Sequence, residues 1–303
     1  MLENRIVFDW LTFTCKEVEE PADLIAFLGL VDYKFELLGG FNGYRQRWFY
    51  DGISILFDGQ PGMGICVNMS GRGCRVFESA GSGDWNSLLK FIYLTESVNL
   101  TRLDVAYDDF TGILLMDELL DDVDKHHYIS KARHWMVQYG SEGASIYHGS
   151  LKSDMLIRIY DKAAEQRVDY HWIRVELQMR REIATGFLRN ALDLPVGTVF
   201  LGVLRNYLRY VVPDDTSNPS RWPMTEYWSE LLDGVSAIRC WESPGAEYTM
   251  EHLYNFVMNQ AGNAIDCYIG ICGYESFIKS LGSRACRPSK KYLDLKERFT
   301  REK

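Results

Sequence analysis

The sequence predicts an α+β protein, mainly an antiparallel sheet with flanking helices, followed by a helical C-terminal region. Apolar and polar residues alternate along many short segments of roughly the first 180 residues, which is the period of half-buried strands. From Thr198 onward apolar residues recur at helical spacing. PDDTSNPSRWP at 213–223 has three prolines and small polar residues that neither pair nor continue a helix. We therefore expect one domain over residues 1–212 and a helical region over 213–303.

The first expected elements belong to the sheet. Residues 6–14 alternate in part and predict a strand, and a short helix follows Pro21. YRQRWFYDGISILF at 44–57 predicts two strands joined at Asp51-Gly52, because both central positions of a tight hairpin tolerate positive φ there. Residues 64–69 predict a further strand that extends the same sheet.

The next elements alternate between helix and strand. Asp84 can cap a helix whose apolar residues recur at helical spacing, namely Trp85, Leu88, Leu89 and Ile92. Residues 114–124 predict a second helix with an acidic face, and TRLDVAYDD at 101–109 lies between the two helices as a strand. Toward the C-terminus, Leu201, Leu204 and Leu208 form one helical stripe, and Thr249 opens a long segment that runs toward Gly270.

The composition is that of a globular protein, with 47% hydrophobic and 25% charged residues in 303. No apolar stretch approaches the roughly 18–20 residues of a membrane-spanning helix. The N-terminus does not resemble a signal peptide, so we expect a cytoplasmic protein with no membrane partner. Seven cysteines without a CxxC pair indicate reduced thiols, and the six scattered histidines do not predict a two-histidine metal site.

The charge distribution bears on possible partners. A formal net charge of −9 argues weakly against nucleic acid, because phosphate binding needs positive potential. The average conceals an acidic run at 117–124 and a basic tail at 284–303. The simplest interpretation of each run is a solvated helix face.

Three segments share one pattern, at residues 102–108, 157–162 and 174–180. Period-two alternation makes each of them apolar on one face and charged on the other. The simplest interpretation is three amphipathic strands of a sheet with one solvated face. The charged faces carry Arg102, Asp104 and Asp108, then Arg158, Tyr160 and Lys162, and finally Arg174, Glu176, Gln178 and Arg180.

The chemical content of these faces favours a functional site. If the three strands are neighbours, they bring together carboxylate ligands for a hard divalent cation, a phenol, and cations for phosphate oxygens. These groups are what phosphoryl transfer to a tyrosine needs. We expect the nearby cations to favour the phenolate over a phenol whose ordinary pKa is about 10. Oxygen ligands favour Mg²⁺ or Mn²⁺ over Zn²⁺.

Two further segments predict phosphate contacts. Ser70-Gly71-Arg72-Gly73-Cys74-Arg75 reads as a glycine-flanked turn that brings backbone N–H groups and two arginines close to a sugar-phosphate chain. An ordinary hairpin turn is the alternative interpretation. Residues 145–153, which include Lys152, lead into the tyrosine strand through a turn containing glycine and serine.

In order and spacing, these segments resemble the rolling-circle replication initiation factors (Rep_trans) of the staphylococcal plasmid type, the MobT conjugative relaxases and the filamentous-phage initiators. The resemblance begins at DWLTFT (9–14) and continues through SGRGCRVFE (70–78) and TRLDVAYDD (101–109). It is strongest at YHGSLKSDMLIRIYDKAAEQ (147–166) and ends at WIRVELQMRREIA (172–184). Each string alone has low specificity, but their order through most of the chain makes the resemblance specific.

The resemblance implies an HUH-like relaxase or Rep core that nicks one strand at an origin, with Tyr160 of the R-x-Y-D-K segment as the nucleophile. It implies a Mg²⁺ or Mn²⁺ site built from carboxylates, for which Asp104 and Glu176 are the first candidates and Asp108 is a third. Residues 1–212 would then be the catalytic domain. We expect phosphate or DNA contacts from Arg158, Lys162, Arg72, Arg75, Lys152 and Arg174.

Expected partners are origin DNA, single-stranded or as an extruded hairpin, a host or element helicase, and a second copy of the chain in a homodimer. Two alternatives stay open: a non-catalytic DNA-binding repressor or adaptor, and a metal nuclease that uses water. The sequence does not separate replication from conjugative transfer. Tyr147 is the reserve nucleophile, and His148 stands where an aliphatic residue is expected, either as a tolerated variant or as an additional ligand or acid.

Overall fold

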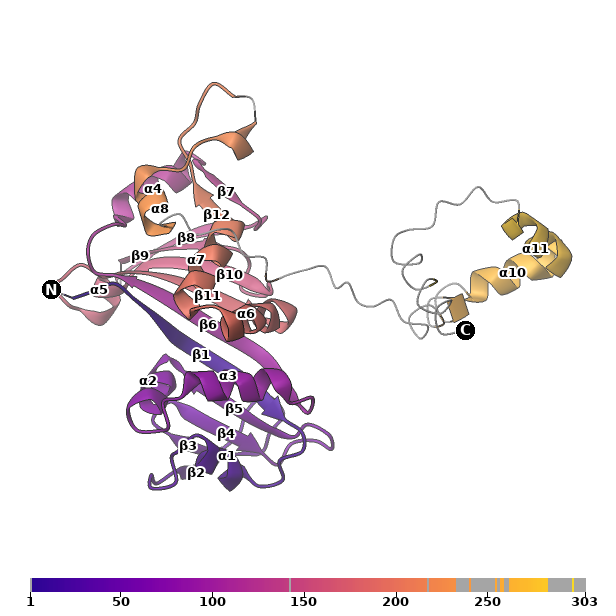
Figure 1. Ribbon diagram of the computed structural model, residues 1–303, viewed down its shortest axis with the longest axis horizontal. Coiled ribbons are helices and arrows are strands. Elements are labelled where there is room, and N and C mark those ends of the chain that lie inside the picture. The colour runs from indigo at the N-terminus through magenta and orange to yellow at the C-terminus, as the bar shows by residue number, and fades with distance from the viewer. Residues whose placement is uncertain are drawn as a thin grey trace. The chain divides into compact units, whose positions relative to one another are not determined.

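The computed structural model describes residues 2–232 apart from 142 and 217, together with residues 240, 254, 257–258, 262–282 and 296. The chain divides into two compact units, Met1–Cys240 and Trp241–Lys303. The first unit contains the sheets and every predicted site residue. The second contributes helices α10 (Gly262–Cys272) and α11 (Tyr274–Gly282) (Figure 1).

Ten strands of the first unit form one sheet in which neighbouring strands run antiparallel. A separate two-stranded sheet pairs β12 (Leu208–Tyr210) with β7 (Tyr128–Ser130). With its helices, this architecture confirms the predicted α+β class. The strands of the large sheet are, in sheet order, β2 (Glu36–Gly39), β3 (Gln46–Tyr50), β4 (Ile53–Phe57), β5 (Ile65–Ser70), β1 (Arg5–Cys15), β6 (Val98–Asp109), β11 (Ile173–Arg180), β10 (Met155–Asp161), β9 (Gly143–His148) and β8 (Trp135–Gly140).

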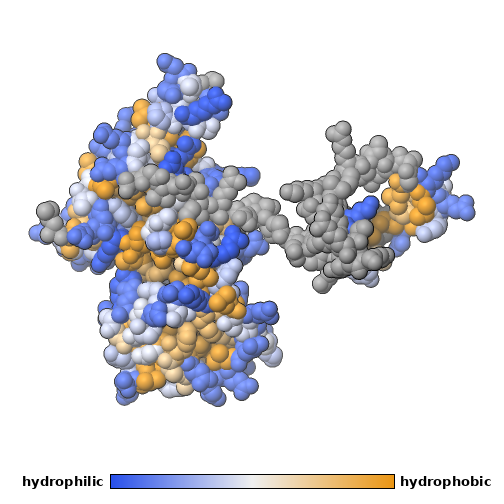
Figure 2. Space-filling model, viewed as in Figure 1, coloured by the Kyte–Doolittle hydropathy of each residue, from blue (hydrophilic) through white to orange (hydrophobic). Residues whose placement is uncertain are grey.

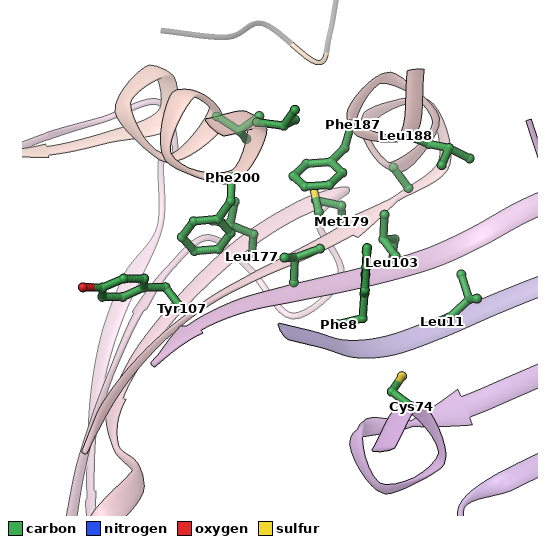
Figure 3. Close-up of a cluster of buried hydrophobic side chains, with 14 of the residues drawn as sticks. Phe8, Leu11, Cys74, Leu103, Tyr107, Leu177, Met179, Phe187, Leu188 and Phe200 are labelled. Atoms are coloured by element: carbon green, nitrogen blue, oxygen red, sulfur yellow. The ribbon is translucent and has the colours of Figure 1, made fainter. Parts of the chain in front are cut away.

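Helices α3 (Trp85–Leu94), α6 (Arg181–Asp193) and α7 (Val196–Tyr207) cover one face of the central strands (Figure 1). Their apolar residues meet the apolar sides of the three amphipathic strands. Figure 3 shows Phe187 and Phe200 reaching from the helices toward Leu103, Leu177 and Met179 of the sheet. Burial of each such side chain contributes about 1.5–3 kcal/mol. The opposite, charged face of these strands is therefore left to form the site.

Several local predictions are confirmed. Asp51 and Gly52 both have positive φ, at 39° and 91°, and join β3 to β4 in a tight hairpin. The Asp84 carboxylate accepts a hydrogen bond from the Ser87 backbone N–H at 3.0 Å and so caps α3. The expected helices after residues 20 and 114 are α1 (Pro21–Phe27) and α4 (Met116–Asp124).

The prediction of a glycine-flanked turn at residues 70–75 is wrong, because these residues begin helix α2 (Gly71–Ser79). The Ser70 hydroxyl accepts a hydrogen bond from the Gly73 backbone N–H at 3.4 Å and caps the helix. The glycines serve close packing: a Cβ on Gly71 would lie 2.7 Å from Asp9 Oδ1, and one on Gly73 would lie 2.4 Å from the Gly52 carbonyl oxygen. The two glycines thus let the first turn of α2 pack closely against β1 and against the β3–β4 turn.

The first compact unit continues past residue 212. Residues 213–223 are irregular apart from a short 3₁₀ helix, Pro219–Arg221, and α8 (Glu226–Leu232) then returns to bury Trp228 in the core. The division at 212–213 stays a prediction about where the catalytic region ends. Much of the expected segment from Thr249 toward Gly270 lies outside the described residues.

Among the described residues, no helix combines the length and apolar character needed to cross a membrane. In the view of Figure 2, hydrophilic side chains cover much of the periphery of the first unit, and hydrophobic side chains gather mainly toward its middle.

Candidate active site

A cleft of about 730 Å³ opens over the charged sides of the central strands. Residues of β1, β6, β11, β10, α2 and α5 (Lys162–Gln166) line it. Strand β11 lies between β6 and β10, so the three amphipathic strands are neighbours, as the predicted site requires. Their register places Tyr160 opposite Arg174. The cleft contains every predicted site residue except Asp108 and Lys152.

Tyr160 lies near the end of β10, and its side chain is almost fully buried. Its hydroxyl is 3.4 Å from Glu176 Oε2. The Arg158 guanidinium lies 4.0 Å from the centre of its ring and the Lys162 ammonium 5.5 Å away. The phenol, one carboxylate and two cations therefore meet, as the sequence predicts.

The expectation that neighbouring cations favour the Tyr160 phenolate is wrong for this arrangement. Burial, followed by the negative charge of Glu176, raises the pKa of Tyr160, although Arg158 and Arg174 act to lower it. Here burial disfavours the charged phenolate by more free energy than the attraction of the two arginines favours it. Tyr160 is therefore a neutral phenol at pH 7, and it must lose its proton before it can attack phosphorus.

Asp104 and Glu176 are two buried carboxylates on neighbouring strands. Asp104 lies opposite Gln178, so the two acids are diagonal neighbours, a relation that places Cα atoms about 7–8 Å apart. Burial raises the pKa of Asp104 to about 7, with Arg102 opposing and Glu176 adding to the rise. Burial also raises the pKa of Glu176. Each acid has an arginine partner, since Arg102 donates to both oxygens of Asp104 and Arg158 donates to Glu176 at 3.1 Å.

The donor chemistry of this pair fits a hard divalent cation. Mg²⁺ is usually held by one or two carboxylates together with water and substrate phosphate rather than by a full set of protein ligands. Asp104 and Glu176 offer two such carboxylates at the wall of the cleft. In the described part of the chain, no three Asp, Glu, His or Cys side chains form a complete metal site, so further ligands would come from water or substrate.

Asp108 has different surroundings from the other two candidate ligands. Its fully buried carboxylate accepts hydrogen bonds from Arg5, Trp172 and twice from Arg174, at 2.6–3.0 Å. Burial acts to raise its pKa, but these donors hold the pKa of Asp108 below its ordinary value. Both carboxylate oxygens of Asp108 accept hydrogen bonds from protein groups, and the two bonds from Arg174 hold its guanidinium beside Tyr160.

Asp9 joins the cleft although the sequence did not single it out. The β1–β6 register shifts between Phe8 and Trp10, which leaves Asp9 at a bulge, and a bulge re-aims side chains. Its Oδ1 accepts a hydrogen bond from Arg174 at 2.8 Å, and its charge raises the pKa of both Asp104 and Glu176. The signal that could have pointed to Asp9 is a break in the alternation of this strand, because the buried positions pass from Phe8 to Leu11, a step of three residues and not of two.

The remaining cations divide between the cleft and its surroundings. Arg72 and Arg75 of α2 line the cleft, where Arg72 pairs with Asp51 and Arg75 donates to the Phe8 carbonyl oxygen at 2.7 Å. Lys162 also lines it and forms an ion pair with Glu165. Lys152 lies in the β9–β10 turn, outside the cleft.

His148 lies on the helix-covered face of the sheet. In the β9–β10 register it stands opposite Ile157, whereas its neighbour Tyr147 stands opposite Arg158. Its Nε2 is 3.1 Å from the Tyr210 hydroxyl. Tyr147 therefore lies on the same face as Tyr160 and Arg158, with which it lines an adjoining pocket, and His148 does not.

Sequence comparison identifies the class of protein to which this fold and cleft belong. Residues 98–281 match the replication initiation factor family, and residues 5–93 match the rolling circle replication initiation protein N-terminal domain. The first match covers more than half of the chain. The chain therefore belongs to the replication initiation factor family, which confirms the resemblance drawn from its motifs.

Two relatives place it more closely. The putative DNA relaxase NicK of Bacillus subtilis (strain 168) is 26% identical over 269 residues, which cover 82% of this chain and 75% of NicK. The solved rolling circle replication initiator protein from Geobacillus stearothermophilus is 31% identical, with a TM-score of 0.71 over 79% of this chain and 99% of that one. These relatives are thus a rolling circle replication initiator and a putative DNA relaxase.

Proposed function

We propose that the protein is a DNA nicking enzyme that cuts one strand of its origin DNA with Tyr160 as the nucleophile. The observation that carries this proposal is the Tyr160 hydroxyl 3.4 Å from the Glu176 carboxylate, at the wall of a cleft lined by cations. Its relatives are described as a relaxase and a rolling circle initiator, which supports the same chemistry here.

The proposed reaction exchanges one phosphate ester for another. The phenolic proton passes to Glu176, its nearest acceptor, and the tyrosine oxygen attacks phosphorus. The new P–O bond forms as the bond to the 3′-oxygen breaks, and that oxygen leaves with the electron pair and takes up a proton. The products are a 5′-phosphotyrosine and a free 3′-hydroxyl, and the reverse reaction religates the strand.

Asp104 and Glu176 are the proposed holders of Mg²⁺ or Mn²⁺, with Asp9 beside them. The bound cation would withdraw charge from the non-bridging phosphate oxygens. We leave Asp108 out of this set because it does not line the cleft and its oxygens accept four hydrogen bonds from three different residues. In our proposal Asp108 positions Arg174.

The cationic side chains of the cleft have two proposed tasks. Arg158, Lys162 and Arg174 surround Tyr160 and stabilise charge on the phosphate. Arg72 and Arg75 guide an unpaired strand, single or extruded, along α2. A DNA contact at Lys152, a helicase partner and a homodimer stay predictions.

The test is incubation of the full chain with intergenic DNA of its own replicon and Mn²⁺, followed by mapping of any protein–DNA adduct. Tyr160→Phe should abolish the adduct and leave DNA binding within about twofold, whereas the matched control Tyr147→Phe should keep it. Denaturing gels separate the alternatives, because only a tyrosine ester leaves protein attached to DNA.

Three results would count against the proposal. Adduct formation by Tyr160→Phe would move the nucleophile elsewhere. Nicked DNA without any attached protein would indicate a nuclease that uses water. Salt-sensitive DNA binding without metal-dependent nicking would indicate a repressor or adaptor.

A further inference from the structure

A second pocket, of about 350 Å³, lies on the opposite face of the sheet from Tyr160. It is formed at the end of the β9–β10 hairpin, against the residues that join β7 to β8 and against α6 and α7. Its volume is within the range of small-molecule sites. Met155, Ile157, Ile183 and Tyr207 give it largely apolar walls.

One buried polar atom without a hydrogen-bond partner belongs to a residue that lines this pocket. His148 lines the pocket and is 1% exposed, and its Nδ1 has no hydrogen-bond partner among the described residues. Leaving such a group unpaired costs about 1–3 kcal/mol. Tyr128 and Tyr210 hold the ring edge to face, at 4.7 and 5.9 Å between centroids, so it is fixed in place.

The proton of His148 can be placed from its other nitrogen. Nε2 is 3.1 Å from the Tyr210 hydroxyl, and in the described part of the chain this is the hydrogen bond that the hydroxyl makes. A buried hydroxyl must donate its single proton, so Nε2 accepts it and Nδ1 carries the ring hydrogen. Burial lowers the pKa of His148 to about 4, which keeps the ring neutral at pH 7. A neutral N–H donor therefore lies at the wall of the pocket, which Ser130, Ser150 and Ser153 also line.

The rim of the pocket adds positive charge. Lys131 and Arg133 are exposed side chains on the segment between β7 and β8, and both line the pocket together with Asp154, which leaves a formal charge of +1. Lys131 lies over the Tyr207 ring, 5.3 Å from its centre, and donates a hydrogen bond to Asn206 Oδ1 at 2.6 Å. The pocket thus has apolar walls for a flat ring, an inner donor for an acceptor on that ring, and outer cations for an attached phosphate.

We propose that this pocket binds an unpaired nucleobase, with the Nδ1–H of His148 donating to a ring nitrogen or carbonyl oxygen and the rim cations facing its phosphate. Every nucleobase offers such acceptors and two faces that pack against apolar side chains. The base belongs either to the DNA strand, turned out of its stack, or to a free nucleotide. The inference goes beyond nicking and does not require it.

The test uses the full chain without divalent metal, so that no strand is cut. Deoxynucleoside monophosphates are titrated while the His148 ring nitrogens are followed by ¹⁵N NMR. Single-stranded oligonucleotides carrying 2-aminopurine at successive positions are titrated in parallel by fluorescence. The matched variants are Tyr210→Phe, which keeps the His148 donor, and His148→Phe with Tyr210→Phe, which removes the donor without leaving a buried hydroxyl unpaired.

We expect the double variant to bind the responding probe about five- to tenfold more weakly than Tyr210→Phe, as loss of one hydrogen bond predicts. A position-dependent 2-aminopurine response supports a base of the strand, and a ¹⁵N shift with monophosphates alone supports a free nucleotide. If the double variant does not fold, Ile183→Trp fills the pocket from α6 and should abolish the response. No response to either probe, or equal binding by the matched variants, overturns the proposal and leaves the assignment of Tyr160 untouched.

Discussion

Replacing Asp108 with asparagine should destabilise the protein by about 3–5 kcal/mol while leaving Mn²⁺ affinity unchanged. The Asp108 carboxylate is fully buried and receives four donors, two of them from an Arg174 side chain that is only 6% exposed. In asparagine an NH₂ group replaces one carboxylate oxygen, and this nitrogen cannot accept the hydrogen bonds that the oxygen accepted. Arg174 would then keep Asp9 as its one remaining carboxylate among the described residues. The predicted cost is that of a buried cation losing a partner.

Thermal unfolding and calorimetric titration with Mn²⁺ measure the two effects separately. At about 2–4 °C per kcal/mol for a unit of this size, the Tm should fall by about 6–20 °C. Asp104→Asn is the matched control, and it should lower Mn²⁺ affinity by at least about tenfold with a smaller loss of stability, because burial already disfavours the charged form of Asp104. If Asp108→Asn instead weakens Mn²⁺ binding as strongly as Asp104→Asn and leaves the Tm unchanged, Asp108 is a metal ligand and the anchoring argument fails.

Three further predictions follow from contacts outside that pair. Gly71→Ala puts a Cβ 2.7 Å from Asp9 Oδ1, so adduct yield should fall with a loss of about 1–3 kcal/mol in denaturant unfolding; unchanged yield would contradict the close packing. Arg72→Ala should lower the slope of log affinity against log salt by about 1, measured by DNA titration from 50 to 200 mM; an equal slope would remove Arg72 from the DNA path. Burial lowers the pKa of His148 to about 4 from near 6.5, so the folded state disfavours the protonated ring. The free energy of unfolding is therefore unaffected by this group above pH 6.5 and falls as the pH drops toward 4, by about 2 kcal/mol at pH 5. Unfolding curves of the wild type should show this loss, and those of the His148→Phe, Tyr210→Phe double variant should not.

The strands of the site could be predicted because their alternation is a local property. Period two places Asp104, Tyr160 and Glu176 on charged faces, whatever the order of the strands in the sheet. That β11 lies between β6 and β10 is a long-range fact that no single segment encodes. The sequence could therefore predict which side chains share a face, while their convergence depended on the assumption that the strands are neighbours.

The incorrect predictions have physical causes. Glycines in Ser70-Gly71-Arg72-Gly73 are typical of a turn, but here each gives room to a neighbouring segment at the start of α2. The sign of the Tyr160 pKa shift depended on burial, which sequence neighbours do not reveal. Asp9 was missed because a bulge breaks the alternation from which the other site residues were predicted.

The net charge of the chain is a poor guide to its partner, because the local charge of the cleft differs in sign from the average. Seven arginine and lysine side chains and five aspartate and glutamate side chains line the cleft, a formal charge of +2 in a chain of −9. Buried Asp104 and Glu176 are the acids whose raised pKa values further reduce the negative charge there. Ions screen charges beyond about 8–10 Å at physiological salt, so a phosphate entering the cleft responds to its walls and not to acidic groups elsewhere. An acidic protein can thus bind a polyanion at this one face.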